Sequence, residues 1–213
     1  MPASTTATKP LPFSAAAVRH LKKADKTLSR VISKVGPCRA LQHPQDTFEA
    51  LLHAITYQQL NGKAARTIHG RVLALFGGKC PSPAKFLEQK EDNLRKAGLS
   101  RNKLAAMRDL AEKSVSGIVP LRKQLEPLSD AEIIERLTQV RGVGVWTAQM
   151  FLMFRLGRPD VLPSGDFGIR KAFGVHFRKN GRMPPPSAVE KHGKLWAPYR
   201  TVASWYLWRS LDD

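Results

Sequence analysis

One carboxylate, that of Asp166, lies where a reactive group would be held in place. It follows Pro163-Ser164-Gly165 and precedes a segment of helical periodicity, so we expect it at a helix N-terminus. A carboxylate fixed there can stabilise positive charge in a transition state, or orient and deprotonate a water molecule. The simpler role for a lone Asp at this position is that of a helix N-cap. The two roles are compatible, because capping fixes the carboxylate.

Two glycines lie upstream of this carboxylate. Gly142-Val143-Gly144 interrupts an apolar-periodic segment that begins near Ser129, and a strongly apolar stretch from Trp146 to Leu156 follows. We expect the glycines to let the chain reverse with positive φ, and the apolar stretch to form a buried helix. The free N–H groups at the start of that helix would bind a phosphate, aided by the helix dipole.

The chain carries far more positive than negative charge. Its 213 residues include 35 Lys and Arg against 17 Asp and Glu, which gives a formal net charge of +18 at pH 7. A field of that sign favours a polyanion, so nucleic acid is the first candidate partner and an anionic membrane surface the second. A protein that is simply basic is the remaining alternative. No apolar run reaches the roughly 18–20 residues that span a bilayer. With nucleic acid as the first candidate, we expect no membrane partner.

Helical periodicity recurs along the chain and no strand alternation is convincing, so the predicted fold class is all-α. Residues 1–13 are rich in Pro, Ala, Ser and Thr and are expected to be a disordered tail, followed by one domain over 14–213. The N-caps that we expect are Asp46, Ser100 and Ser129. The expected helices cover residues 14–34, 47–57, 63–76, 101–116, 129–140 and 146–156, with shorter ones near 82 and 91–97 and more after Asp166.

These motifs resemble the helix-hairpin-helix DNA glycosylases, most closely the alkylated-base branch of the 3-methyladenine DNA glycosylase II type. The resemblance rests on V-x-G-V-G-x-W-T-A from Val140 to Ala148, followed by L-P-x-x-D from Leu162 to Asp166. ITYQQLNGKAA at 55–65 and WAPYRTVASWYLW at 196–208 are weaker matches. The resemblance implies two helical lobes with a DNA-binding cleft. One lobe would cover roughly residues 46–141, and the other would combine 14–45 with 142–213.

The resemblance also implies the activity. We expect a monofunctional DNA glycosylase that flips alkylated purines, of the 3-methyladenine and 7-methylguanine type, and excises them by hydrolysis in base excision repair. Asp166 would then be the catalytic carboxylate, stabilising the oxocarbenium character of the sugar. The alternatives are a glycosylase for deaminated or oxidised bases, and a non-catalytic helix-hairpin-helix module that only binds DNA. A pure binder needs no carboxylate at 166.

A flipped base needs a pocket, and the gap that it leaves must be filled. Aromatic rings would stack on an electron-poor base, with core packing as the alternative role for each. The expected pocket residues are Trp146, Trp208, Tyr57 and Met150. Leu60 matches the family's apolar wedge, and its neighbours Gln58, Gln59 and Asn61 would read or support the opposite strand. The alternative for this segment is an ordinary polar turn between helices.

DNA phosphates would be bound by backbone N–H groups and by basic side chains. The expected contacts come from Gly142, Gly144, Val145, Arg101 and Lys103. In the family a monovalent cation, Na⁺ or K⁺, often lies under the hairpin, and the matching main-chain carbonyls are those of Thr138, Val140 and Val143. We expect no catalytic metal. With only Cys38 and Cys80, the chain lacks the thiolates for the iron–sulfur cluster of some relatives.

Strand scission by bifunctional relatives uses a lysine just after the glycine hairpin. Trp146 occupies that place here, and no lysine lies between Arg141 and Arg170, so no lyase activity is expected. Lys171 is the first lysine beyond, and a helix would point it away from Asp166. We expect a monomer that acts on damaged double-stranded DNA. It would work in the cytoplasm or nucleoid of a bacterium, or in the nucleus of a eukaryote.

Overall fold

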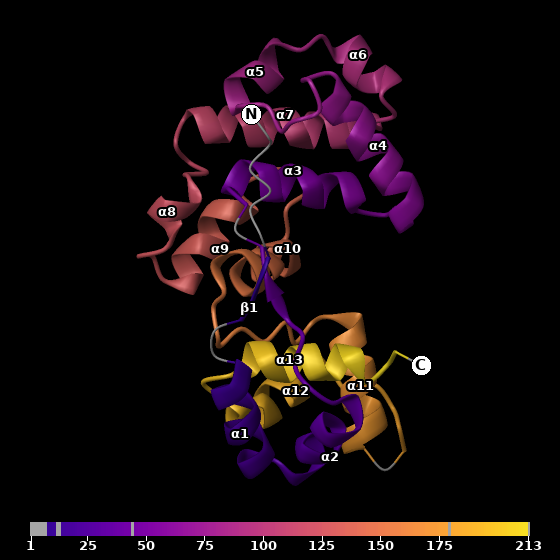
Figure 1. Cartoon of the computed structure of the whole chain (residues 1–213), viewed down its shortest axis with the longest axis vertical. Helices are drawn as coiled ribbons and strands as arrows, with labels where there is room; N and C mark the ends of the chain where they lie inside the picture. The colour runs from indigo at the N-terminus through magenta and orange to yellow at the C-terminus, as the bar shows by residue number, and fades with distance from the viewer. Residues whose placement is uncertain (1–7, 12–13, 44, 179, 213) are drawn as a thin grey trace. The chain divides into compact units, whose positions relative to one another are not determined.

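The computed structural model describes residues 8–11, 14–43, 45–178 and 180–212, and helices account for most of them (Figure 1). Within these ranges the strand pairing is a short antiparallel ladder between β1 (Lys9–Pro10) and β2 (Leu41–Gln42). The predicted all-α fold class is therefore confirmed. In the part of the chain that the structure describes, no helix is long and apolar enough to cross a membrane.

Contacts between residues divide the chain into two compact units. The first is Met1–Pro44 with Leu152–Asp213, and the second is Gln45–Phe151. The sequence places the boundary between its two expected lobes earlier, near residue 141. The difference arises because α10 (Val145–Phe151) packs on α9 (Asp130–Thr138) and on α3 (Thr47–Tyr57), both in the second unit.

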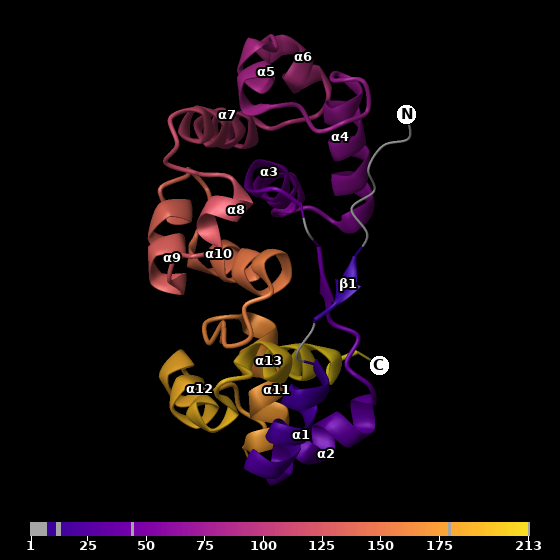
Figure 2. The ribbon, with the colours of Figure 1, turned by 60° about the vertical axis from the view of Figure 1, so that its left-hand side comes forward.

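The second unit is built from short helices around α3 and α7 (Arg101–Val115), which pack on each other. Beside α7 lie α5 (Pro83–Glu88) and α6 (Glu91–Lys96), and beside α3 lies α4 (Gly62–Ala74) (Figure 2). The short helix α8 (Arg122–Leu125) precedes α9. The apolar face expected on α3 is buried, and it consists of Phe48, Leu51, Leu52 and Ile55.

Side-chain caps explain where three helices of this unit begin. Asp46 Oδ1 accepts the first N–H of α3 at 2.7 Å. Ser100 Oγ accepts the N–H of Lys103 at 3.2 Å at the start of α7. Ser129 and Glu132 exchange hydrogen bonds in a capping box at the start of α9. All three expected N-caps are confirmed.

The first unit is formed by both ends of the chain. Its helices are α1 (Ser14–Ala24), α2 (Lys26–Val35), α11 (Phe167–Phe177), α12 (Pro186–Gly193) and α13 (Arg200–Arg209), with a 3₁₀ turn η2 (Lys194–Trp196). A π-helical turn η1 (Leu152–Leu156) continues α10, so the single helix expected over 146–156 has two geometries. The packing of α11 on α13, and of both on α2, encloses the core of this unit.

The first expected helix is in fact two helices, because the chain breaks at Asp25. Asp25 has an extended backbone, with φ −145°, and its Oδ1 accepts the N–H groups of Thr27 and Leu28 at 2.9 and 3.0 Å. Its Oδ2 lies 2.8 Å from His192 Nε2 and accepts the indole N–H of Trp196 at 2.9 Å. The buried carboxylate thus joins the first helices to α12 and η2.

The prediction of a disordered tail over residues 1–13 is wrong for residues 9–11. Lys9 and Pro10 pair with β2, and Leu11 is buried with its N–H donated to Ala40 O at 3.1 Å. Burial of Leu11 and the pairing of residues 9–11 with residues 40–42 hold the chain in place here. Residues 1–7 and 12–13 lie outside the described residues.

We expect Asp25→Ala to lower the free energy of unfolding by about 2–4 kcal/mol at pH 7, because it removes a cap and leaves a buried indole N–H without its acceptor. Asp25→Asn keeps a capping oxygen and should cost less. The measurement is urea denaturation followed by circular dichroism. Equal stabilities of Asp25→Ala and the wild type would contradict this account of the break.

The same carboxylate makes stability depend on pH. Burial by itself raises the pKa of Asp25, but hydrogen bonds from Trp196, His192 and the Leu28 N–H outweigh it and hold the pKa below its ordinary value. The stabilisation is therefore complete above the unfolded-state pKa of about 3.9 and is lost as pH falls through the lower folded-state value. The stability difference between wild type and Asp25→Asn should shrink over that acidic interval.

Candidate active site

Asp166 caps α11, as the sequence predicts. Its Oδ1 accepts the N–H of Ile169 at 2.8 Å, and the same oxygen accepts the indole N–H of Trp208 at 2.8 Å. Hydrogen bonds to a carboxylate are among the stronger ones in proteins, so the two donors fix where the charge lies. The side chain is half-buried. Asp166 is thus a partly accessible anion held by two separate elements, α11 and α13.

The approach of Trp208 requires a glycine at position 168. A Cβ at Gly168 would lie 2.9 Å from Trp208 Cδ1 and 3.2 Å from Nε1, which is too close for the indole to remain in place. On its other side the ring of Trp208 lies 6.2 Å from that of Phe154. The sequence analysis did not identify Gly168. The signal was present, because a glycine within a helix is used where another group must approach the backbone closely.

The loop before Asp166 is supported by α12. The buried Ser164 donates its hydroxyl to Glu190 Oε1 at 2.6 Å. A Cβ at Gly193 would collide with the side chain of Leu162, so that glycine lets α12 pack closely under the loop. Glu190 and Gly193 are further residues of the site that sequence reasoning missed, since neither lies near Asp166 in sequence.

The glycine hairpin lies in the second unit and matches its expected geometry in part. Gly142 has a φ of +76°, and the N–H of Val143 donates to Val140 O at 3.0 Å, which closes the turn. Gly144 does not have a positive φ, so that expectation is wrong for the second glycine. Its role is different, because its carbonyl accepts the N–H of Ala148 and starts α10. A Cβ at Gly144 would meet nothing within 4 Å, so its surface is open to a ligand.

Two side chains hold this hairpin. Gln58 donates its amide to Gly142 O at 2.9 Å, so Gln58 has a structural role that the sequence did not reveal. Asp109 accepts the N–H of Arg141 at 2.7 Å. Burial by itself raises the pKa of Asp109. The hydrogen bond from the Arg141 N–H and the ion pair of Asp109 with Lys113 outweigh this effect, so the pKa of Asp109 is lowered. The hairpin is therefore anchored before any ligand arrives.

The two basic side chains expected to meet phosphate differ in their surroundings. Arg101 is exposed at the start of α7. Lys103 donates its ammonium to Thr56 O in the last turn of α3, and partial burial lowers its pKa. An ammonium has three donors, so a phosphate contact from Lys103 remains compatible with this bond. Lys103 nevertheless has a structural role that the sequence did not reveal.

The expected wedge segment is a tight turn between α3 and α4. Gln59 has a φ of +56°, which is unusual for a residue with a side chain, and Leu60 is 38% exposed. Asn61 caps α4 by accepting the N–H of Ala64 at 2.9 Å. An apolar side chain is thus presented at the tip of a polar turn. The neighbouring Asn61 side chain is already used for capping.

The expected pocket residues fall into both units. Trp208 lies with Asp166 in the first unit, whereas Tyr57, Trp146 and Met150 belong to the second. Trp146 is 50% exposed on the first turn of α10, and Met150 is half-buried on the same helix. Tyr57 stacks on His53 with ring centroids 4.1 Å apart. The helix expected to be buried therefore exposes its beginning.

The carbonyls at which the sequence predicts a monovalent cation are main-chain groups of the hairpin. Among the described residues, no group of three or more His, Cys, Asp or Glu side chains could hold a metal ion. Val140 O accepts the N–H of Val143, and a carbonyl oxygen has a second lone pair for a cation. The main-chain oxygens of Thr138, Val140 and Val143 are hard ligands of the kind that Na⁺ and K⁺ take.

The fold, the hairpin and the capped carboxylate together define a class of protein. The family model of the HhH-GPD superfamily of base excision DNA repair proteins matches residues 52–198, which is more than half of the chain. The match includes both the Gly142 hairpin and Asp166. The chain belongs to this superfamily.

Individual relatives agree over most of the chain. DNA-3-methyladenine glycosylase 1 of Schizosaccharomyces pombe is 35% identical, over 90% of this chain and 85% of the relative. The solved structure of the 3-methyladenine DNA glycosylase Mag1 of that yeast, in complex with abasic DNA, has a TM-score of 0.79 and 36% identity, covering 91% of this chain and 95% of that one. A DNA-3-methyladenine glycosidase structure from Bacillus halodurans has a TM-score of 0.84 and 36% identity, covering 95% and 91%.

Gly168→Ala tests whether the close approach of Trp208 depends on this glycine. We expect it to displace the indole from Asp166 and to cost about 1–3 kcal/mol of stability through overpacking. The readouts are thermal denaturation and the chemical shift of the Trp208 indole N–H in a ¹H–¹⁵N spectrum. Gly165→Ala is the matched control, because a Cβ there meets nothing within 4 Å. If both variants left the indole signal in place, the steric argument would be wrong.

Proposed function

We propose that this chain is a monofunctional DNA glycosylase that hydrolyses the bond between deoxyribose and an alkylated purine in double-stranded DNA. The observation that carries the proposal is the carboxylate of Asp166, held by Ile169 and Trp208 in a chain of a base excision repair superfamily. The relatives named 3-methyladenine glycosylases support alkylated purines, such as 3-methyladenine and 7-methylguanine, as the substrate class.

The proposed chemistry uses the charge of Asp166 twice. As the glycosidic bond breaks, the sugar acquires oxocarbenium character, and a preorganised anion near the anomeric carbon stabilises it. The same carboxylate orients or deprotonates the attacking water. Because Trp208 and the N-terminus of α11 already hold Asp166, little reorganisation is needed when the charge develops. An N-alkylated purine with a formal positive charge is a good leaving group, so no elaborate general acid is required.

The chain has no lysine in the place that a lyase needs. Trp146 follows the hairpin where bifunctional relatives carry their nucleophile, and no lysine lies between Arg141 and Arg170. Lys171 is exposed on α11, five residues beyond the carboxylate that caps this helix. We therefore propose that base release leaves an intact abasic site.

The second unit would bind and deform the duplex. Leu60 would enter the stack in place of the flipped base, from a turn that Gln58 ties to the Gly142 carbonyl. Tyr57 and Trp146 would stack on the extruded base, and Met150 would line its pocket. Phosphate contacts from the N–H groups of Gly142, Gly144 and Val145 would be joined by Arg101 and Lys103. A monovalent cation at the hairpin carbonyls would support the same contact.

Two rival functions separate by experiment. A glycosylase of deaminated or oxidised bases would have the same fold and would release a different free base. A module that only binds DNA would release no base. The capped carboxylate of Asp166 argues against this function, because a pure binder needs no carboxylate there. Chromatography of the bases released from methylated, deaminated and oxidised DNA distinguishes all three. A repair enzyme of this kind would work at the chromosome, in the nucleoid of a bacterium or the nucleus of a eukaryote.

Asp166→Asn should slow base release by about 10²–10³-fold, because it removes the charge that stabilises the sugar cation. Asn is also a good N-cap, so the fold and DNA affinity should remain. The measurements are single-turnover release of 3-methyladenine from methylated duplex DNA and DNA binding by fluorescence anisotropy. In the wild-type reaction the product strand should stay uncut until alkali is added. A variant with near wild-type release would remove Asp166 from the mechanism.

Leu60→Ala should slow release from duplex DNA by about 10-fold or more, because less apolar surface fills the gap in the stack. Release from single-stranded substrate should change little. Leu75→Ala is the matched control, since Leu75 is 36% exposed against 38% for Leu60 and lies at the other end of α4. An unchanged single-turnover rate on duplex DNA would rule out the wedge role.

A further inference from the structure

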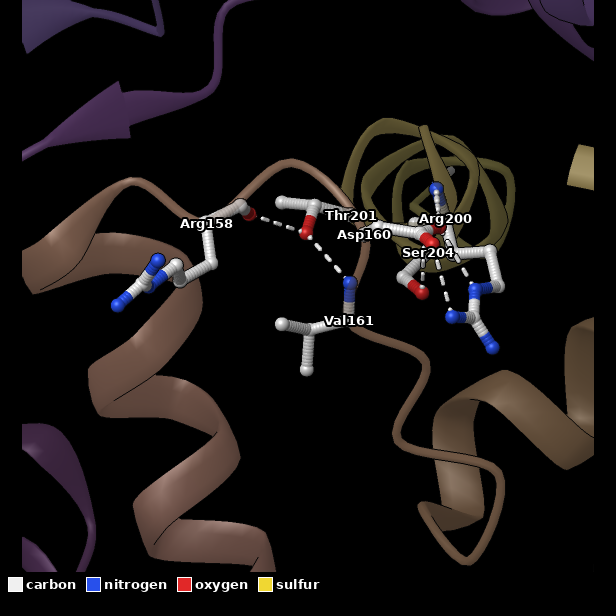
Figure 3. Close-up of polar contacts among 6 residues, drawn as sticks. All are labelled: Arg158, Asp160, Val161, Arg200, Thr201 and Ser204. Carbon is white, nitrogen blue, oxygen red and sulfur yellow. Dashed lines mark hydrogen bonds and ion pairs between the residues drawn. The ribbon is translucent and has the colours of Figure 1, made fainter. Parts of the chain in front are cut away.

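The first two residues of α13 form hydrogen bonds with the start of the loop that leads to Asp166. Thr201 is fully buried, and its hydroxyl donates to Arg158 O at 2.6 Å while accepting the N–H of Val161 at 3.1 Å (Figure 3). The N–H of Thr201 donates to Pro159 O at 3.0 Å. One residue therefore satisfies three backbone groups of the loop.

The neighbouring residue adds a charged clamp to the same segment. Arg200 meets both carboxylate oxygens of Asp160, with Nε at 2.7 Å from Oδ1 and a terminal nitrogen at 2.8 Å from Oδ2 (Figure 3). The backbone N–H of Arg200 also lies 3.3 Å from Oδ1. A two-point contact of this kind fixes orientation as well as distance. Arg200 and Thr201 together hold four consecutive residues, 158–161.

The same helix also holds the other end of the loop. Trp208 lies seven residues after Thr201, two turns along α13 and on the same face, and it donates to Asp166 Oδ1 at 2.8 Å. At a rise of 1.5 Å per residue, the two anchor points are about 10 Å apart along the helix axis. A straight helix has a fixed length, so it sets the separation of the loop's beginning from its carboxylate.

We propose that Thr201 is a positioning residue for Asp166, and that α13 acts as a rigid spacer whose N-terminal clamp determines where the carboxylate lies. The inference rests on the proposed function, in which Asp166 acts at the anomeric carbon. A displacement of about 1 Å at a reacting group can cost about 10²-fold in rate, so the hydroxyl far from the chemistry affects the chemical step.

Thr201→Val is the test, because valine has nearly the same shape and lacks the hydroxyl. We expect the single-turnover rate of 3-methyladenine release to fall at least about 10-fold, while the Kd for duplex DNA stays within about 2-fold. The Trp208 indole N–H signal should move, since its partner Asp166 has shifted. Thr201→Ser restores both hydroxyl hydrogen bonds and should recover the wild-type rate and signal.

Ser204→Ala controls for a loss of stability in the same helix. Ser204 is fully buried and donates its hydroxyl to Arg200 O at 2.8 Å, a hydrogen bond that lies within α13 (Figure 3). It should lower the melting temperature and leave the rate unchanged at temperatures where the protein is folded. If Thr201→Val does not fold, Asp160→Asn opens the exposed side of the clamp and should slow release while leaving Kd unchanged.

The outcomes separate the two proposals. A wild-type rate with an unmoved Trp208 signal in Thr201→Val overturns the positioning role, and so does a rate loss that Ser204→Ala reproduces. A wild-type protein that releases no base from methylated DNA overturns the proposed function instead. In that case the indole N–H signal of Trp208 alone tests the positioning role of Thr201, because it reports the position of Asp166 without any reaction.

Discussion

One oxygen of one carboxylate joins the two helices on which the candidate site depends. Asp166 Oδ1 accepts a first-turn N–H of α11 and the indole N–H of Trp208 on α13. The indole reaches it only because position 168 is glycine, where any side chain would occupy the place of the ring. Packing between α11 and α13 therefore sets the position of the charge. The indole of Trp208, which the sequence predicts to stack on a base, also holds the carboxylate of Asp166.

The surroundings of Asp166 explain why a half-buried charge is tolerated there. Its partners are fixed before substrate arrives, so the desolvation cost is met within the folded protein. Ser164 and Glu190 hold the residues just before it, and Leu162 packs against Gly193 beneath them. A preorganised anion of this kind suits a reaction in which positive charge develops and then disappears.

Side-chain hydrogen bonds hold the hairpin and the last turn of α3 in the second unit. Gln58 holds the hairpin at Gly142, and Asp109 holds it at Arg141. Lys103 satisfies a carbonyl at the end of α3, just before the turn that exposes Leu60. Part of the chain's excess positive charge is thus used inside the protein. The formal net charge of the chain is still +18, because a hydrogen bond within the protein leaves the charge of the lysine unchanged. A polyanion therefore still meets a positive field.

The sequence by itself determined the features that depend on neighbouring residues. Helix starts at Asp46, Ser100 and Ser129 follow from capping groups that bond to N–H groups one to three residues away. The same reasoning places Asp166 at the start of α11 and a positive φ at Gly142. The all-α class follows from periodicity, which is also a local property.

Tertiary structure alone decided what depends on distant residues. Trp208 is 42 residues from Asp166 in sequence, and Trp196 is 171 from Asp25, yet both bonds determine where a carboxylate lies or a helix breaks. The second positive φ expected in the hairpin fails at Gly144 because that residue starts α10. Periodicity and capping depend only on residues that lie within a few positions of one another in the sequence. A hydrogen bond between helices depends on how their surfaces pack, which no local pattern contains.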